Sequence, residues 1–323
     1  MKQKLLVFDG DKLRTETIDA PGRFRWVSWN LADKDGSALI AGDRGTLVSY
    51  RKGGFRRIRT HTSQNLRCVG FSPVDDAAYV CGNKGTILNA TLTSCEPLKE
   101  NGARENLRRV GWSSTGGSAL VVGNEGAAYA LWPGASPEKV RGAETNLRSV
   151  AWHPVERYAL VCGNCFQGSI GGLTPSPNLF RFDEGGSSLV DLQDIAESRA
   201  DLTSANWQPD GSSCLLVGFD QTWHTPSCLS YEGGTLRQIP WGGGNVFPTA
   251  SAWHPSGGYA ILGTCLMRAG EGECSLYRYD FRRGSEIAKL SDLQGFGVSC
   301  IAWSPDGSRA LLTGSASERA FSA

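Results

Sequence analysis

A short pattern of apolar and small residues recurs along the whole chain, and it is clearest between Val110 and Gly126. There an apolar strand ends at an aromatic residue, a polar turn follows, and a second, wholly apolar run leads to a glycine. The aromatic residues at this place, which we call the anchors, follow one another at intervals of 40 to 55 residues. This spacing predicts seven structural repeats. The anchors are Trp29, Phe71, Trp112, Trp152, Trp207, Trp253 and Trp303.

Each anchor is followed by a small residue near the start of the second strand and by a glycine at its end. The small residues are Ala38, Ala78, Ala119, Ala159, Cys214, Ala260 and Ala310. The glycines are Gly42, Gly82, Gly123, Gly163, Gly218, Gly263 and Gly314. The intervening turn is of the Ser304-Pro-Asp-Gly307 type, in which proline presets φ and glycine accepts a positive φ. A second strand that is apolar throughout is typical of a strand covered on both faces.

Each repeat has room for four antiparallel strands. In the first repeat the third strand is predicted over residues 46–50 and a more polar fourth strand over residues 55–59. Repeats of this kind predict an all-β fold, a seven-bladed β-propeller that spans residues 1–323 as a single domain. The last repeat has too few residues for its third and fourth strands, and residues 6–18 resemble the hairpin 47–58. We therefore expect the N-terminal strands to complete the last blade and close the ring.

The anchors, the Ser-Pro-Asp-Gly turn and the repeat length resemble those of WD-repeat β-propellers over essentially the whole chain. The sequence departs from typical WD repeats because it lacks their Trp-Asp and Gly-His pairs. The resemblance implies a rigid disc that serves as a docking platform. It favours a scaffold that binds other proteins over an enzyme.

The position four residues before the anchor, near the start of the first strand, divides the chain into two parts. Four consecutive repeats have arginine there and the next three have a hydroxyl: Arg25, Arg67, Arg108, Arg148, Thr203, Thr249 and Ser299. The residue assigned after the strand-ending glycine follows the same division: Asp43, Asn83, Asn124, Asn164, Phe219, Thr264 and Ser315. Both positions belong to one face of a propeller, so we expect these side chains near the mouth of the central channel.

Two interpretations of the arginines stay open, and both can hold together. In the first, each guanidinium uses its donors to bind the Asp or Asn of a nearby turn, and the ring is structural. In the second, the arginines that face neutral Asn keep an uncancelled charge. They would then bind a phosphate, a carboxylate or an acidic side chain.

Long connections in the fourth to sixth repeats are expected on the same face. They cover residues 164–178, 219–227 and 264–273, and the approach to the fifth repeat, residues 191–201, is also long. Loops on a rigid scaffold often carry function. Trp223 and His224 are candidates for a recognition site, with ordinary loop packing as the alternative, and Asp220 forms with His224 a loop His–Asp pair.

Charge and composition narrow the classes of function. The chain has 33 Lys and Arg against 32 Asp and Glu, a balance that argues against a nucleic-acid-binding surface. It has neither an apolar run of about 20 residues, which a membrane span needs, nor the roughly 7–15 of a secretory signal. We therefore expect a cytoplasmic monomer with no membrane or nucleic-acid partner.

Motifs for catalysis or cofactor binding are not visible, so we assign no catalytic residue and expect no cofactor and no metal. The ten cysteines are expected to be thiols, with two alternatives. One is a zinc site built from Cys165, Cys228, Cys265 and His224, and the other is a disulfide between Cys265 and Cys274. The sequence thus predicts a non-enzymatic scaffold for a protein or peptide with an acidic element. The alternative is a small anionic ligand, or an enzymatic site, at the channel mouth.

Overall fold

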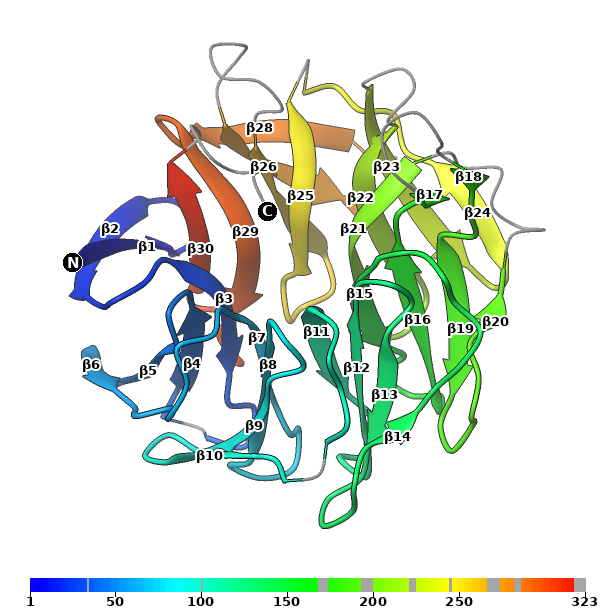
Figure 1. Cartoon of the computed structure of the whole chain (residues 1–323). Coiled ribbons are helices and arrows are strands. Elements are labelled where there is room, and N and C mark those ends of the chain that lie inside the picture. The colour runs from blue at the N-terminus through cyan, green and yellow to red at the C-terminus, as the bar shows by residue number, and fades with distance from the viewer. Residues whose placement is uncertain are drawn as a thin grey trace.

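The computed structural model describes residues 1–33, 35–99, 101–167, 174–192, 200–220, 225–243, 246–265, 274–281 and 286–316. These residues form seven four-stranded antiparallel sheets and one small hairpin. The sheets follow one another as blades around a ring (Figure 1). The predicted all-β fold with seven blades is confirmed. No helix in the described part of the chain is long and apolar enough to cross a membrane.

The strands of each blade follow the order predicted from the repeat. Blade 1 contains β3 (Phe24–Trp29), β4 (Ser37–Gly42), β5 (Thr46–Arg51) and β6 (Gly54–Arg57). Blade 2 contains β7 (Leu66–Phe71), β8 (Ala78–Gly82), β9 (Ile87–Ala90) and β10 (Cys95–Pro97), and blade 3 contains β11 (Leu107–Trp112), β12 (Ala119–Gly123), β13 (Ala128–Leu131) and β14 (Glu138–Lys139). Blade 4 contains β15 (Leu147–Trp152), β16 (Tyr158–Gly163), β19 (Leu179–Asp183) and β20 (Val190–Asp191).

The remaining blades are built in the same way. Blade 5 contains β21 (Ala200–Trp207), β22 (Cys214–Asp220), β23 (Thr225–Glu232) and β24 (Thr235–Gln238). Blade 6 contains β25 (Phe247–Trp253), β26 (Tyr259–Cys265), β27 (Ser275–Asp280) and β28 (Glu286–Asp292). Blade 7 contains β29 (Phe296–Trp303), β30 (Ala310–Ala316), β1 (Lys2–Phe8) and β2 (Leu13–Asp19). The extra hairpin, β17 (Phe166–Gln167) with β18 (Thr174–Pro175), lies in the long connection of blade 4.

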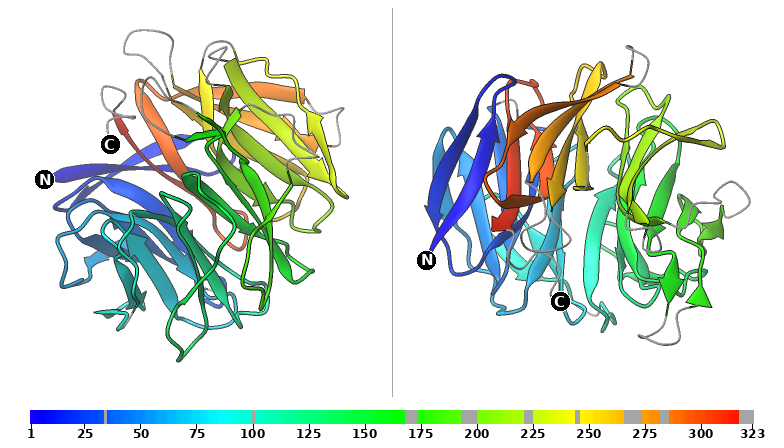
Figure 2. Two further views of the ribbon diagram at one scale, coloured as in Figure 1. Left: turned by 45° about the vertical axis from the view of Figure 1, so that its right-hand side comes forward. Right: turned by 90° about the horizontal axis from the view of Figure 1, so that it is seen from above.

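The two ends of the chain close the ring within blade 7. Strand β1 pairs with β30 in antiparallel register, with Leu6 opposite Leu312 and Phe8 opposite Ala310. The views of Figure 2 agree in placing the N-terminal strands beside the C-terminal ones. The predicted completion of the last blade by the N-terminal strands is therefore confirmed.

The anchors fill the wedges between neighbouring blades, as aromatic side chains with large buried areas can. The indole N–H of Trp112 donates to the carbonyl of Gly70 in blade 2, and that of Trp152 donates to Gly111 in blade 3. The indoles of Trp29, Trp207 and Trp253 donate to the preceding blade in the same way. Each of these anchors therefore joins its blade to the one before it.

The register of blade 6 corrects one assignment made from the sequence. Pro248 pairs with Thr264, whereas the equivalent residues of the other blades pair with glycine. Thr264 therefore takes the place assigned to Gly263, and Cys265 the place assigned to Thr264. At Gly218, for comparison, an added Cβ would meet the Asp201 carbonyl at 1.9 Å, so glycine is needed there. In blade 6 the regular pairing continues to Cys265, and the Thr264 hydroxyl accepts the N–H of Ser275.

Candidate functional site at the central channel

A β-bulge interrupts the inner strand of every blade at the same place. The skipped residues, which we call the ring, are Arg25, Arg67, Arg108, Arg148, Thr203, Thr249 and Ser299. A bulge leaves its extra residue outside the ladder and re-aims the side chain. The seven blades thus direct equivalent side chains toward the common axis.

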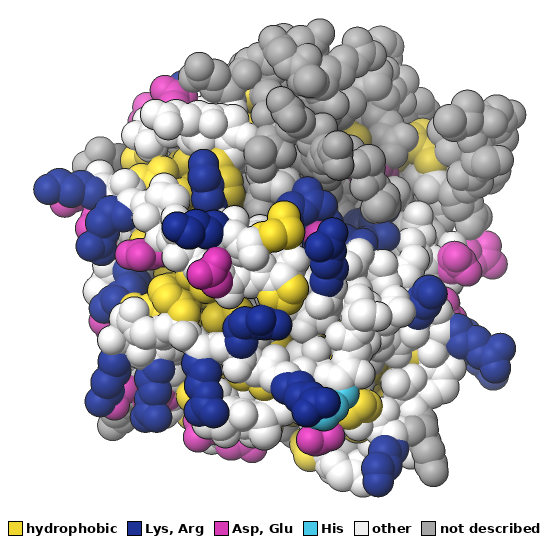
Figure 3. Space-filling model, turned by 60° about the vertical axis from the view of Figure 1, so that its left-hand side comes forward, with side chains coloured by type: hydrophobic (Ala, Val, Ile, Leu, Met, Phe, Trp, Pro, Cys, Tyr) yellow, Lys and Arg dark blue, Asp and Glu magenta, His cyan; other side chains and the backbone are white. Residues whose placement is uncertain are grey.

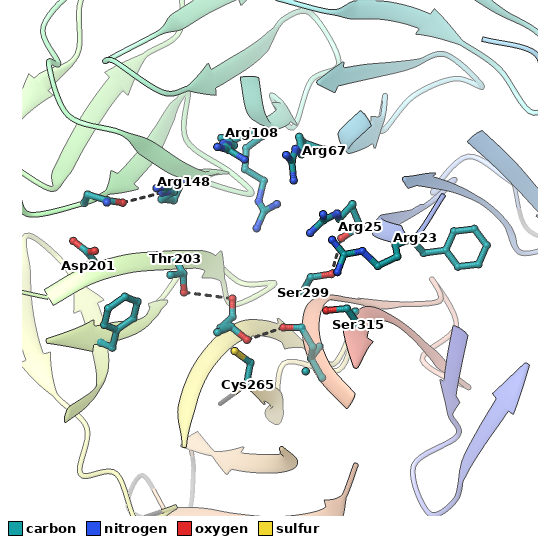
Figure 4. Close-up of a pocket in the computed structure, with 18 residues that line it drawn as sticks. Arg23, Arg25, Arg67, Arg108, Arg148, Asp201, Thr203, Cys265, Ser299 and Ser315 are labelled. Carbon is teal, nitrogen blue, oxygen red and sulfur yellow. Dashed lines mark hydrogen bonds between the residues drawn. The ribbon is translucent and has the colours of Figure 1, made fainter. Parts of the chain in front are cut away.

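A cavity of about 470 Å³ opens at this end of the channel, and all seven ring residues line it. Figure 4 shows Arg25, Arg67, Arg108 and Arg148 on one side of the cavity and Thr203 and Ser299 on the other. The division seen along the sequence is therefore also a division in space. One half of the wall is cationic and the other carries hydroxyl groups.

The turns of blades 1 to 4 position the arginines of the cationic half. Arg25 forms two hydrogen bonds with Asp43, from Nε to Oδ1 at 2.9 Å and from Nη2 to Oδ2 at 3.0 Å. The other three donate from Nε to a neutral amide: Arg67 to Asn83 at 2.9 Å, Arg108 to Asn124 at 3.0 Å and Arg148 to Asn164 at 2.8 Å. The structural interpretation of these contacts matches the observed geometry, and each partner comes from the same blade as its arginine.

The charges of the three amide-bound arginines are not cancelled by these contacts. Burial, together with the charges of Arg148 and Arg67, lowers the pKa of Arg108 to about 10. Burial also lowers the pKa of Arg67, with a further contribution from the Arg25 charge. A guanidinium still stays protonated at neutral pH. The cationic half is therefore a partly desolvated set of like charges.

The hydroxyl half links blades 5, 6, 7 and 1 through backbone contacts. The hydroxyl of Thr203 lies 3.1 Å from the Val217 carbonyl of its own blade and 3.3 Å from the Thr249 carbonyl of blade 6. The hydroxyl of Thr249 donates to Val298 at 2.7 Å. The hydroxyl of Ser299 donates to the Arg25 carbonyl at 2.8 Å. Because a hydroxyl has a single proton, these groups have little left to donate to a ligand.

Three charged residues of the cavity wall were missed by the sequence reasoning: Arg23, Arg109 and Asp201. Arg23 donates to Asp43 at 3.3 Å, and the Arg109 guanidinium lies 3.4 Å from the ring centre of Trp26, a cation–π contact. Asp201 is 4% exposed and accepts the N–H of Cys165 at 2.8 Å. Arg109 has a signal in the sequence, because the equivalent position elsewhere is never charged: Trp26, Cys68, Ser149, Ser204, Ala250 and Cys300.

The other candidates from the sequence are only partly described. Trp223 and His224 lie outside the described residues, and so does most of the connection 264–273. Asp220 ends β22 opposite Thr225, at the base of the loop that holds Trp223. All ten cysteines are buried. In the described ranges, no three His, Cys, Asp or Glu residues lie close enough to hold a metal ion.

Charged residues outside the channel are distributed differently. Figure 3 shows the side of the ring with the N-terminal strands, where Lys and Arg are scattered and interspersed with Asp and Glu. Several of these cations form exposed ion pairs, such as Lys52 with Asp35 and Arg14 with Asp9. Some cations of the outer surface are thus paired with carboxylates.

The fold and its repeated inner-strand geometry define a WD-repeat-like seven-bladed β-propeller. The family described as "WD domain, G-beta repeat" matches residues 287–319, which contain most of β28 and the pair β29–β30. Among solved structures, the chain is similar to the β-propeller domain of Cps50 (Swd1) from Myceliophteria thermophila. The two are 12% identical with a TM-score of 0.65, and the match covers 93% of this chain and 98% of that domain. At this identity the likeness shows the fold.

A curated relative matches a shorter part of the chain. It is the "Uncharacterized peptidase YuxL" of Bacillus subtilis (strain 168), which is 28% identical over 134 residues. The match covers 40% of this chain and 20% of the peptidase, so the chain spans only a small part of that protein's length.

Proposed function

We propose that this propeller is a non-enzymatic scaffold that binds a protein or peptide through the face bearing the ring. An acidic element of the partner enters the channel, and the long connections of blades 4 to 6 contact the surface around it. The observation that carries the proposal is the set of three inward arginines with neutral partners, Arg67, Arg108 and Arg148. Guanidinium groups held in this way are suited to bidentate contacts with an anionic group.

A second candidate is a small anionic ligand held in the channel without a protein partner. The volume of the cavity, about 470 Å³, favours it, because pockets for small molecules measure roughly 300–1,000 Å³. The arginines of the wall supply charged groups for polar recognition. Both candidates place the anion at the same arginines.

The test compares the wild type with the double variant Arg67→Met, Arg108→Met as immobilised baits in a lysate of the organism of origin. The matched control is Arg56→Met, Arg57→Met, which removes two exposed arginines from the outer strand β6. We expect proteins with acidic segments to bind the wild type and the control and to be lost from the channel variant. Mass spectrometry of proteins and metabolites in the same eluates separates the two candidates.

Two outcomes would contradict the proposal. If the channel variant melts at a lower temperature but retains every protein and metabolite that the wild type binds, the arginines serve the fold alone. If a metabolite is lost while the proteins are retained, the small-ligand candidate replaces the scaffold.

A further inference from the structure

The charges of the cavity wall do not balance among the described residues. Six arginines line it: Arg23, Arg25, Arg67, Arg108, Arg109 and Arg148. The carboxylates close to them are Asp43, which holds Arg25 and Arg23, and Asp201. Four positive charges are left over. A single carboxylate would neutralise one of them, whereas a phosphoryl group brings almost two charges and three acceptor oxygens.

The donors that remain available lie on three consecutive blades. Arg67, Arg108 and Arg148 use Nε for their Asn partners. The structure shows no hydrogen bond from their Nη atoms to any residue that it describes. Because the Asn contact fixes each guanidinium plane, the Nη groups are positioned before a ligand arrives. Several fixed guanidinium groups around one site match the three oxygens of a tetrahedral oxyanion better than the two of a carboxylate.

The hydroxyl half of the wall has few hydrogen-bond donors left for an anion. The hydroxyls of Thr203, Thr249 and Ser299 donate to backbone carbonyls of the next blade. Asp201 lies beyond Arg148 on the Thr203 side of the cavity (Figure 4) and repels an anion there. Arg67 and Arg108 are the amide-bound arginines farther from this carboxylate. An anion is therefore drawn away from the axis toward blades 2 and 3.

We infer that the channel binds a multiply charged oxyanion of the phosphoryl class, held against Arg67 and Arg108 rather than on the axis. This inference rests on the proposed function, because it specifies the chemistry of the acidic element. The phosphoryl group comes either from a free ion such as pyrophosphate or from a phosphorylated side chain of a partner. The experiment distinguishes these two sources.

The experiment is isothermal titration calorimetry on the full chain with four probes: sodium pyrophosphate, sodium acetate, a short glycine peptide with one phosphoserine, and the same peptide with glutamate. We expect pyrophosphate to bind at least about tenfold more tightly than acetate, or the phosphopeptide to exceed the glutamate peptide by the same factor. Raising the salt should weaken this binding because ions screen the charges. Whichever phosphoryl probe binds identifies the source.

The main variant is Asn83→Asp, Asn124→Asp, which gives Arg67 and Arg108 the type of partner that Arg25 already has in Asp43. It cancels the charge without removing a guanidinium, so the fold is retained and the loss of binding is informative. Arg67→Met, Arg108→Met should lose binding as well. Arg56→Met, Arg57→Met on β6 should bind like the wild type.

The other results would contradict the inference alone or the inference together with the proposed function. If the glutamate peptide binds as tightly as the phosphopeptide and pyrophosphate no better than acetate, the inference fails and the scaffold proposal stands. If Asn83→Asp, Asn124→Asp binds pyrophosphate like the wild type, the anion is not at these arginines and the inference fails. If no probe binds and the Met variant retains all captured partners, the inference and the proposed function fail together.

Discussion

Replacing Asn124 by aspartate tests whether Arg108 carries an uncancelled charge. The substitution copies blade 1, where Asp43 holds Arg25 through two hydrogen bonds of 2.9 and 3.0 Å. In the described part of the chain, the amide nitrogen of Asn124 donates no hydrogen bond, so a second oxygen there breaks none. We expect Asn124→Asp to stabilise the folded chain.

The magnitude follows from the environment of Arg108. A pKa lowered from 12.5 to about 10 corresponds to about 3 kcal/mol against the charged form. Burial is the largest cause and remains in the variant, the channel is open to solvent, and the new carboxylate is itself partly desolvated. We therefore expect a net gain of about 1 kcal/mol, the difference between a neutral and a charge-assisted hydrogen bond. In a domain of this size it should raise the melting midpoint by about 2 °C.

The assay is thermal unfolding at neutral pH, followed by circular dichroism at low and high salt. The gain should shrink at high salt, where the Debye length falls to about 3 Å. It should also disappear as the pH falls below about 4, because the new carboxyl has a lowered pKa in the folded state and its stabilisation needs the ionised form. The control is Gln238→Glu, which adds the same charge at an exposed position of β24. A midpoint lowered by Asn124→Asp but not by the control would refute the reasoning.

Three further predictions concern the ring closure and the contacts between blades. Deleting residues 1–20 removes β1 and β2 and uncovers the edge of β30, so the melting midpoint should fall and the chain should unfold cooperatively. An unchanged midpoint would contradict the closure of the ring by these strands. Thr249→Val removes the hydroxyl that donates to Val298 at 2.7 Å, and it should lower the free energy of unfolding in urea by about 1 kcal/mol, whereas Thr17→Val on the exposed strand β2 should have no effect. His153 contacts the Gly211 carbonyl at 3.1 Å and packs on Trp207, so His153→Ala should lower the same free energy by about 2 kcal/mol. His153→Gln should recover part of that loss, because Gln208 already makes the equivalent contact to Gly257 at 2.8 Å; equal losses for both variants would argue against this role.

The number of blades could be predicted from the sequence because each anchor performs the same task. An anchor such as Trp112 fills the wedge beside blade 2 and donates to Gly70. An aromatic residue therefore recurs wherever a blade packs against the preceding one. The apolar second strands recur for a related reason. Strand β12, for example, is buried along its whole length between neighbouring blades. Features that every blade needs are visible as repeats.

The direction in which the ring side chains point could be predicted only in part. Their equivalent positions indicated a common face, but the bulge that turns them toward the cavity is an interruption of pairing, which side-chain alternation does not reveal. Near the bulge, the consecutive residues Arg108 and Arg109 both line the cavity. Strict alternation would have placed them on opposite faces of the strand. This is why Arg109 was missed.

The assignment of Thr264 failed for a different physical reason. Glycine marks the end of the second strand where the backbones of the two inner strands approach too closely for a side chain, as at Gly218. Blade 6 has threonine at the equivalent position, opposite Pro248. At Gly263, one residue earlier, an added Cβ would meet the Val298 side chain, so this glycine does not mark the same backbone approach as Gly218.

The ring itself separates what the fold requires from what it does not. Blades 5, 6 and 7 each meet the next blade of the ring through a hydroxyl, that of Thr203, Thr249 or Ser299, which binds the neighbouring backbone without any charge. The same bulge in blades 1 to 4 carries arginine, and every one of these arginines needs a turn side chain to hold it. Closing the ring of blades does not by itself require arginines placed so close together that their charges lower one another's pKa. Since three blades satisfy the bulge without arginine, the arginines of the other four are an addition to the closure, and an anionic ligand gives that addition a physical reason.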